Sequence, residues 1–217
     1  MVPIRENLVP KDKYAIKCPY TRTPTRVIIH NTANDAPAAN EISYMRYNDL
    51  EISFHYAVDD VNIVQGIPEN RNAWASGDGH GKGNMEGIHI EICYSKSGGE
   101  KFDKAEQNAA EFTASLLKKY GWGIDKVTKH RDYDGKYCPH RTLDRGWQRF
   151  LSMVKRYMEP AKTPVASKFI PYLIRKNCRD ALNIRKGPST NYGILGQIKD
   201  TLRYTIVEER SGPGSAK

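Results

Sequence analysis

The chain has 217 residues, of which 39% are apolar and 27% are charged. This composition is typical of a globular protein, and no segment approaches the roughly 18 consecutive apolar residues of a membrane-spanning helix. Charged residues interrupt residues 1–13, so the continuous apolar core of a secretory signal is missing. We therefore expect synthesis in the cytoplasm without a signal peptide, and no insertion into a membrane.

The net charge of +9 is unevenly distributed. Residues 161–217 contain 11 Lys or Arg and 4 Asp or Glu, a net charge of +7, whereas the remainder carries 23 minus 21, or +2. A concentrated positive end predicts an anionic partner such as nucleic acid, a membrane surface or an anionic polymer. Nucleic acid is disfavoured, because the sequence has no aromatic stacking motif and no recognition-helix pattern.

The first 159 residues alternate strand-like and helix-like patterns. Short apolar runs predict strands at residues 26–30, 53–59, 62–66 and 87–94. A long helix is predicted to begin at Asp103, which with Glu106 resembles a capping box, and to end at Gly121. Apolar residues at helical spacing predict another helix over 143–158, with its apolar stripe packed on the sheet.

A linker is predicted at residues 160–168, where two prolines flank small residues. Beyond it, β-rich runs at 169–175 and 204–208 are separated by Gly and Pro. They predict a small all-β unit over 169–217. The expected domains are therefore 1–159 and 169–217.

Several side chains could bind a metal. His30 closes an apolar strand, and seven residues separate His130 from Cys138 around a turn at Asp134-Gly135. Imidazole and thiolate suit zinc, and three protein ligands leave a fourth position for water. Each side chain alone also has an ordinary packing explanation, and the sequence has no zinc-finger or His-Glu-x-x-His pattern. His140 is an alternative third ligand.

The four cysteines are too few and too scattered for a disulfide scaffold, which leaves at least one free to be a ligand.

Glu91 belongs to an alternating strand in which Ile88, Ile90 and Ile92 face one side and Glu91 faces the other. Packing in an apolar core does not explain a carboxylate opposite a face of isoleucines. Glu91 is therefore a candidate functional residue.

Five short sequence motifs together resemble those of the zinc amidase family shared by phage endolysins, bacterial autolysins and animal peptidoglycan-recognition proteins. They are residues 27–32 (VIIHNT), 53–60 (SFHYAVDD), 90–94 (IEICY), 130–132 (HRD) and 138–141 (CPHR). The resemblance implies a mixed β-sheet flanked by helices, with zinc bound by His30, His130 and Cys138. It also implies a zinc-dependent N-acetylmuramoyl-L-alanine amidase of phage endolysin type, which cleaves the amide bond between N-acetylmuramic acid and L-alanine in bacterial peptidoglycan.

The resemblance also implies catalytic roles. Glu91 corresponds to the general base that activates water at the zinc, and Lys136 matches by offset a lysine that stabilises the oxyanion. Phe54 departs from the pattern, because some relatives carry a tyrosine there that assists catalysis. Further candidate contacts with the sugar and the peptide are Tyr44, Trp74, Asn84 and Arg131.

The tail resembles a bacterial SH3-like cell-wall-binding module over residues 181–190, 195–196 and 204–209. The Gly-Trp strands that normally close this small barrel are missing, so we expect a partial module. Its positive charge predicts binding to an anionic cell-wall polymer. We expect the protein to act on the wall after holin-dependent release or other export.

Alternatives remain open at this stage. A non-catalytic peptidoglycan-binding protein is one, although a cysteine at 138 argues against it. A cysteine peptidase that pairs Cys138 with His130 is another.

Overall fold

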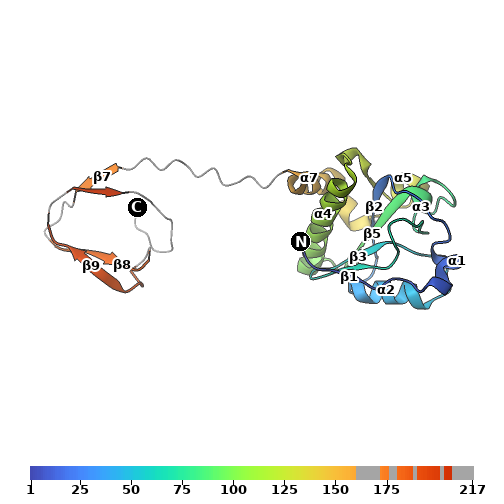
Figure 1. Cartoon of the computed structure of the whole chain (residues 1–217), viewed down its shortest axis with the longest axis horizontal. Helices are drawn as coiled ribbons and strands as arrows, with labels where there is room; N and C mark the ends of the chain where they lie inside the picture. Colours follow the sequence, from blue (N-terminus) through green and yellow to red (C-terminus); the bar gives the residue numbers. More distant parts are fainter. Residues whose placement is uncertain (160–171, 176–179, 188–189, 201–202, 207–217) are drawn as a thin grey trace. The chain divides into compact units, whose positions relative to one another are not determined.

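The computed structural model describes residues 1–159, 172–175, 180–187, 190–200 and 203–206. The chain divides into two compact units, Met1–Ala161 and Lys162–Lys217 (Figure 1). The predicted linker at 160–168 lies outside the described residues. No helix in the described part of the chain is both long enough and apolar enough to cross a membrane.

A mixed sheet forms the centre of the first unit. In spatial order the described strands are β1 (Ile4–Glu6), β4 (Ile63–Gln65), β3 (Tyr56–Val58), β5 (Gly87–Ile92), β2 (Arg26–Asn31) and β6 (Val127–Lys129). Strands β3 and β4 are antiparallel, and the other neighbouring pairs are parallel. The expected mixed sheet is confirmed, although most strands are shorter than predicted.

Helices flank this sheet, as expected (Figure 1). They are α1 (Tyr14–Lys17), α2 (Ala38–Tyr47), α3 (Lys82–Glu86), α4 (Gly99–Tyr120), α5 (Arg131–Asp134), α6 (His140–Asp144) and α7 (Trp147–Met158), with 3-10 turns at Lys11–Lys13 and Ile124–Lys126. Helix α4 covers one face, where Phe112 packs edge-on against Tyr56 with ring centroids 4.6 Å apart. Helix α2 covers the other face, where Ile42 and Met45 leave no room for a side chain at Gly66.

The predicted start of the long helix was wrong. Helix α4 begins at Gly99, four residues before Asp103. The Glu106 carboxylate does not cap the helix, because it accepts hydrogen bonds from Arg149 Nη2 at 2.6 Å and Arg145 Nη1 at 3.1 Å. The predicted end is confirmed, since Gly121 adopts the left-handed conformation with φ 68°.

The predicted helix over 143–158 is two helices. Helix α6 ends at Asp144, and α7 begins at Trp147 after Gly146, whose φ of 99° requires glycine. The apolar stripe of α7, which includes the buried Phe150 and Val154, packs chiefly against α4. The expected packing of this stripe on the sheet is replaced by packing on α4, because α4 already covers that face.

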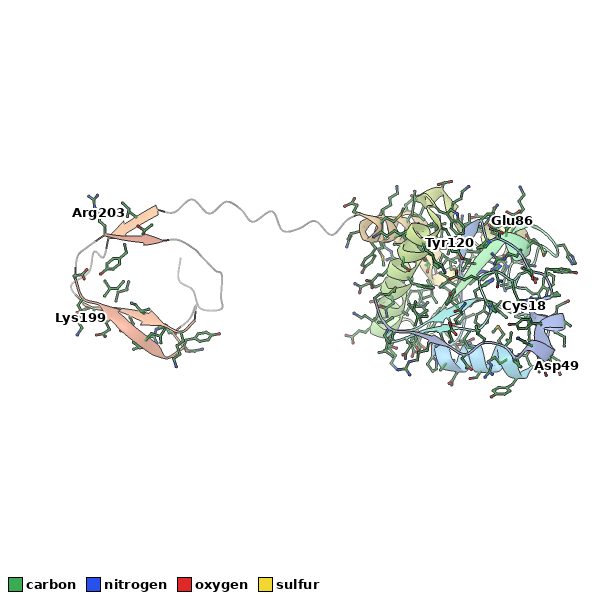
Figure 2. The ribbon with its side chains drawn as sticks, viewed as in Figure 1. Cys18, Asp49, Glu86, Tyr120, Lys199 and Arg203 are labelled. Carbon is green, nitrogen blue, oxygen red and sulfur yellow. The ribbon has the colours of Figure 1, made fainter. Side chains whose placement is uncertain are left out.

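Both faces of β5 are buried. Ile88, Ile90 and Ile92 have no exposed surface, and neither does His89 on the opposite face. Burial of one large apolar side chain contributes about 1.5–3 kcal/mol to the free energy of folding, so the three isoleucines of this central strand stabilise the sheet. Side chains fill the interior of the first unit, where Cys18 is also fully buried (Figure 2).

The described strands of the second unit form two antiparallel pairs. Strand β7 (Tyr172–Arg175) pairs with β10 (Arg203–Ile206), and β8 (Leu182–Arg185) pairs with β9 (Ile194–Ile198). The predicted β content agrees with these pairs. The SH3-like module is not confirmed and stays a prediction.

Candidate metal and catalytic site

The three predicted metal ligands lie together at one edge of the sheet. His30 is near the carboxyl end of β2, and His130 directly follows the neighbouring parallel strand β6. Cys138 lies between α5 and α6, and its carbonyl accepts a hydrogen bond from Arg131 N. One ligand atom from each of the three buried side chains lies within 4.8 Å of the others. This arrangement is a possible metal site.

The imidazole rings present their Nδ1 atoms to the centre of this cluster. His30 Nδ1 lies 3.1 Å from His130 Nδ1 and 4.0 Å from Cys138 Sγ. Each Nε2 atom already has a partner, because His130 Nε2 lies 3.1 Å from Asp134 Oδ2 and His30 Nε2 lies 3.0 Å from His89 Nδ1. Such outer partners orient histidine ligands and leave the opposite nitrogen free for a metal.

Asn31 holds the segment that carries Cys138. Its side-chain oxygen accepts hydrogen bonds from the backbone nitrogens of Arg141 at 3.0 Å and Thr142 at 3.2 Å, at the start of α6. The residue next to one candidate ligand therefore fixes the position of another.

The protonation of Cys138 argues against a cysteine peptidase. Burial, together with the nearby Glu91 carboxylate, raises the pKa of the Cys138 thiol to about 12. A cysteine nucleophile needs a lowered pKa and access to substrate, and Cys138 is only 6% exposed. A metal ligand, in contrast, is deprotonated by the metal itself.

Glu91 lies directly beside the cluster. It is paired with His30 in the register of β5 and β2, and its Oε1 lies 4.0 Å from His30 Nδ1. Burial raises the pKa of Glu91 to about 8, the Glu41 carboxylate contributes to this rise, and the Lys136 ammonium opposes it. Glu91 Oε2 is inaccessible and has no hydrogen-bond partner among the described residues. A carboxyl group that has an unbonded oxygen and a pKa near neutrality suits proton transfer.

Lys136 lies in the exposed loop that precedes Cys138. Its backbone N–H donates to Asp134 Oδ1 at 2.8 Å, and its positive charge lowers the pKa of both Glu91 and His30. Lys136 is therefore close enough to act on the cluster from the solvent side. Its part in catalysis stays a prediction.

Other predicted residues lie elsewhere. His140 Nε2 donates to the Ser95 carbonyl at 3.2 Å, which favours Cys138 as the third ligand. Phe54 is buried in the core, and Trp74 Nε1 donates to the Ile16 carbonyl at 3.0 Å. Tyr44 is 65% exposed and remains available for contact with a ligand.

The sequence interpretation gave no role at the cluster to Asn31 and Asp134, and it took His89 for a structural or groove-lining residue. Asp134 follows His130 by four residues, a spacing that brings side chains together on a helix and could have been recognised. His89 shares a strand face with Glu91, which was also visible in the alternation. Nothing in the sequence pattern pointed to the role of Asn31.

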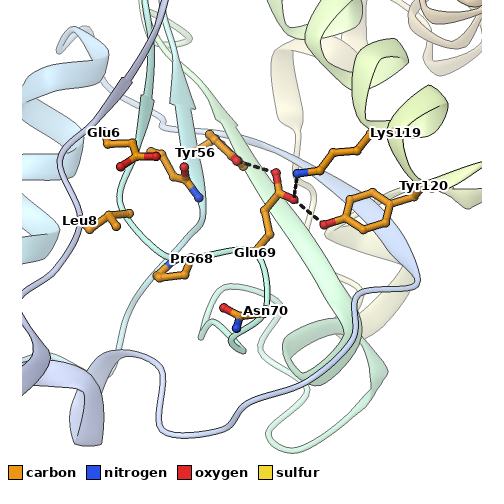
Figure 3. Close-up of a pocket in the computed structure, with 9 residues that line it drawn as sticks. Glu6, Leu8, Tyr56, Pro68, Glu69, Asn70, Lys119 and Tyr120 are labelled. Atoms are coloured by element: carbon orange, nitrogen blue, oxygen red, sulfur yellow. Dashed lines mark hydrogen bonds and ion pairs between the residues drawn. The ribbon is translucent and has the colours of Figure 1, made fainter.

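A separate pocket of about 390 Å³ lies beside the end of α4. Figure 3 shows its Glu69 carboxylate accepting hydrogen bonds from three side chains, Tyr56, Lys119 and Tyr120. Tyr56 pairs with Ile90, so its side chain lies on the opposite face of the sheet from Glu91. The pocket is thus distinct from the metal cluster.

Comparison with known proteins identifies the family. A family profile for N-acetylmuramoyl-L-alanine amidase matches residues 20–141. The N-acetylmuramoyl-L-alanine amidase XlyB of Bacillus subtilis (strain 168) is 50% identical over 181 residues, which cover 81% of this chain and 57% of XlyB. The amidase CwlA of the same organism is 58% identical over 146 residues, covering 67% and 54%. The chain spans about half the length of these curated relatives.

Solved structures give the same result. The structure of PlyL matches with a TM-score of 0.69 and 53% identity, covering 70% of this chain and 96% of the PlyL chain. The catalytic domain of XlyA matches with a TM-score of 0.64 and 36% identity, covering 70% and 98%. These matches confirm the predicted α/β fold. The chain therefore belongs to the N-acetylmuramoyl-L-alanine amidase family.

Proposed function

We propose that this chain is a zinc-dependent amidase that hydrolyses the bond between N-acetylmuramic acid and L-alanine in bacterial peptidoglycan. One observation carries the proposal within this family. Two imidazole nitrogens and a cysteine sulfur converge beside Glu91, a partly buried carboxyl group with one unbonded oxygen. This combination suits metal-assisted hydrolysis of an amide.

His30, His130 and Cys138 would hold the zinc ion. Their nitrogen and sulfur donors are those that zinc prefers, and three protein ligands are typical of a catalytic zinc site. When bound, zinc supplies Lewis acidity that polarises the amide carbonyl and lowers the pKa of water.

Glu91 and Lys136 would carry the proton transfer and the charge stabilisation. The Glu91 carboxylate, whose Oε1 lies 4.0 Å from His30 Nδ1, takes a proton from the attacking water and returns it to the amine of the departing L-alanine. The Lys136 ammonium approaches from the solvent side and stabilises the negative charge that develops on the carbonyl oxygen. No covalent bond between enzyme and substrate is required.

The test is release of new amino-terminal L-alanine from purified Gram-positive peptidoglycan, identified by end-group analysis. Glu91→Gln keeps the size of the side chain but removes the proton acceptor, so the release rate should fall about 10²- to 10⁴-fold. Glu100→Gln is the matched control, because Glu100 is an exposed acid in the first turn of α4, and its rate should match the wild type.

Other outcomes would refute the proposal. New reducing sugar ends, or new amino ends other than L-alanine, would show that a different bond is cut. Wall binding without any cleavage would favour a non-catalytic peptidoglycan-binding protein instead.

We also propose that the basic segment 161–217 binds an anionic cell-wall polymer and that the chain acts on the wall after leaving the cytoplasm. The net charge of +7 supports the first statement. The second is supported by a similarity to endolysin PlyTW of Staphylococcus phage Twort, which is 27% identical over 223 residues.

A further inference from the structure

A buried relay of two hydrogen bonds through His89 connects the candidate metal cluster to the glycine-rich segment at residues 77–84, a loop that runs into helix α3. His89 has no exposed surface and lies between the two. Its Nδ1 is 3.0 Å from His30 Nε2, and its Nε2 is 3.1 Å from the Gly83 carbonyl oxygen. The metal chemistry of the proposed function assigns no part to either His89 or Gly83.

The direction of these hydrogen bonds follows from the chemistry of the groups. A carbonyl oxygen can only accept, so His89 Nε2 must carry a hydrogen. A buried imidazolium without a carboxylate partner would be costly, so the His89 ring is neutral and its Nδ1 is an acceptor. His30 Nε2 must then donate. The buried His30 ring is also neutral, because the nearest carboxylate oxygen, Glu91 Oε1 at 4.0 Å, is too far from its Nδ1 to accept a hydrogen bond, so Nδ1 keeps a bare lone pair.

That bare nitrogen is the one that faces the cluster. His30 Nδ1 lies 3.1 Å from His130 Nδ1 and 4.0 Å from Cys138 Sγ. A neutral imidazole binds a metal through its unprotonated nitrogen. The tautomer that the hydrogen bonds impose on His30 is therefore the one that a metal at this cluster needs.

The Gly83 carbonyl is itself held in place. Gly83 N donates to Asp78 Oδ2 at 2.7 Å, and Asp78 Oδ1 accepts from Asn84 N at 3.1 Å. A Cβ atom at Gly83 would lie 2.6 Å from Ser76 Cβ and 2.8 Å from Tyr133 Cδ1, so only glycine fits here. The start of α3 thus presents a fixed acceptor to His89.

We propose that His89 is a positioning residue which, anchored by the Gly83 carbonyl, fixes His30 in the tautomer with a bare Nδ1 and so preforms the metal site. This inference rests on the zinc site of the proposed function. It assigns to the glycine-rich segment 77–84 the task of orienting a metal ligand through His89.

Nitrogen NMR of the histidine rings tests the tautomer directly. The whole chain is labelled with ¹⁵N and measured first without metal and then with ¹¹³Cd in place of zinc. The expected result is a hydrogen on His30 Nε2 without metal, and coupling of ¹¹³Cd to His30 Nδ1. A hydrogen on His30 Nδ1 without metal, or coupling of ¹¹³Cd to Nε2, would overturn the inference. This measurement needs no variant, so it stands even if substitutions prevent folding.

Two substitutions of His89 test its two ring hydrogen bonds separately, the one to His30 and the one to the Gly83 carbonyl. In His89→Asn the amide oxygen lies near the position of Nδ1 and can still accept from His30. In His89→Gln the amide group reaches the position of Nε2 and the Gly83 carbonyl but leaves His30 without an acceptor. Loss of such an outer partner typically weakens metal binding about 10- to 100-fold, so we expect this increase in the zinc Kd for His89→Gln and a smaller one for His89→Asn.

His55→Gln is the matched control. His55 is also fully buried and stacks on His89 with ring centroids 5.6 Å apart. Its Nδ1 accepts from the His89 backbone N–H at 3.1 Å, but its ring makes no hydrogen bond to the His89 ring or to the three candidate ligands. Its zinc Kd should stay close to that of the wild type even if the melting temperature falls. An unchanged zinc Kd in folded His89→Gln, or an equal increase in His55→Gln, would refute a positioning role.

The experiments on His89 and the test of the proposed function can fail independently of each other. The zinc Kd and the NMR signals are measured without peptidoglycan. If both behave as expected but no L-alanine is released, the proposed function fails and the relay stands. If L-alanine is released and His89→Gln binds zinc normally, only the relay fails.

Discussion

Burial controls the charge of the residues at the candidate site. It lowers the pKa of His30 and His89 well below 6.5, and it raises the pKa of Glu91 to about 8 and that of Cys138 to about 12. Each shift favours the uncharged form. The protein interior thus favours the uncharged forms of these four neighbouring side chains. The ionisation of Cys138 is therefore coupled to the binding of a cation.

The same burial makes the stability of the chain sensitive to acid at His55. Burial lowers the pKa of His55 well below 6.5, and the charge of Arg22 lowers it further. In the unfolded chain His55 binds a proton near pH 6.5, whereas in the folded chain it does not. The free energy of unfolding should therefore fall as the pH drops below about 6.5, by about 1.4 kcal/mol per pH unit for this residue.

Urea unfolding at pH 5 to 8, with a chelator to exclude metal, measures this effect. His55→Gln should reduce the slope of the unfolding free energy between pH 6.5 and 5. Equal slopes in wild type and His55→Gln would show that His55 is not kept neutral by the fold.

At the scale of elements, Glu106 joins α4 to the segment of α6 and α7. Its carboxylate is 1% exposed and accepts hydrogen bonds from Arg145 and Arg149. Glu106→Ala removes charge-assisted hydrogen bonds and leaves two guanidinium groups without this partner. The free energy of unfolding should fall by about 2–3 kcal/mol, measured by urea denaturation.

Asp103→Ala provides the comparison. Asp103 also pairs with Arg145, at 2.5 Å, but its side chain is 53% exposed. An exposed ion pair contributes less than about 1 kcal/mol, so this variant should lose far less stability than Glu106→Ala. Equal losses in the two variants would contradict the idea that burial makes Glu106 important.

Glu106 also shows where sequence interpretation reaches its limit. The spacing of Asp103 and Glu106 predicted a local helix cap, but the Glu106 side chain is used for a contact with residues some forty positions later. Periodicity predicted four of the six strands of the sheet, and Gly121 predicted the end of α4, because these depend on neighbouring residues. Strands β1 and β6 were not predicted, because three residues are too few to show an alternation. The start of α4 and the packing of α7 depend on contacts distant in sequence, which periodicity does not contain.

The candidate site shows the same division. The resemblance of short motifs was sufficient to nominate His30, His130, Cys138 and Glu91, because family motifs record the residues of a site. The supporting contacts of Asn31 and His89 arise only when β2, β5 and the loop before α6 come together. Side chains that orient other side chains carry little signal in a single sequence.

At the scale of the whole molecule, the two units differ in charge, with +7 in residues 161–217. If that segment binds an anionic wall polymer, wall binding must weaken with salt, because screening shortens the range of electrostatic attraction to about 3 Å at 1 M. Sedimentation of the chain with purified walls at low and high salt measures this. Binding should fall with salt, and a fragment of residues 1–159 should show a weaker dependence.

Walls stripped of their anionic polymers serve as the control for this prediction. The full chain should bind them no better than residues 1–159 do. Undiminished binding of the full chain to stripped walls, or binding that ignores salt, would show that the charge of the second unit does not mediate attachment.

The most direct test of the central claim is the release of amino-terminal L-alanine from peptidoglycan as zinc is added back to the metal-free chain. The account predicts no release without metal, a rise that saturates at about one zinc ion per chain as expected for a three-ligand site, and loss of this recovery in Cys138→Ser. Full release from a chain shown to contain no metal would contradict the account.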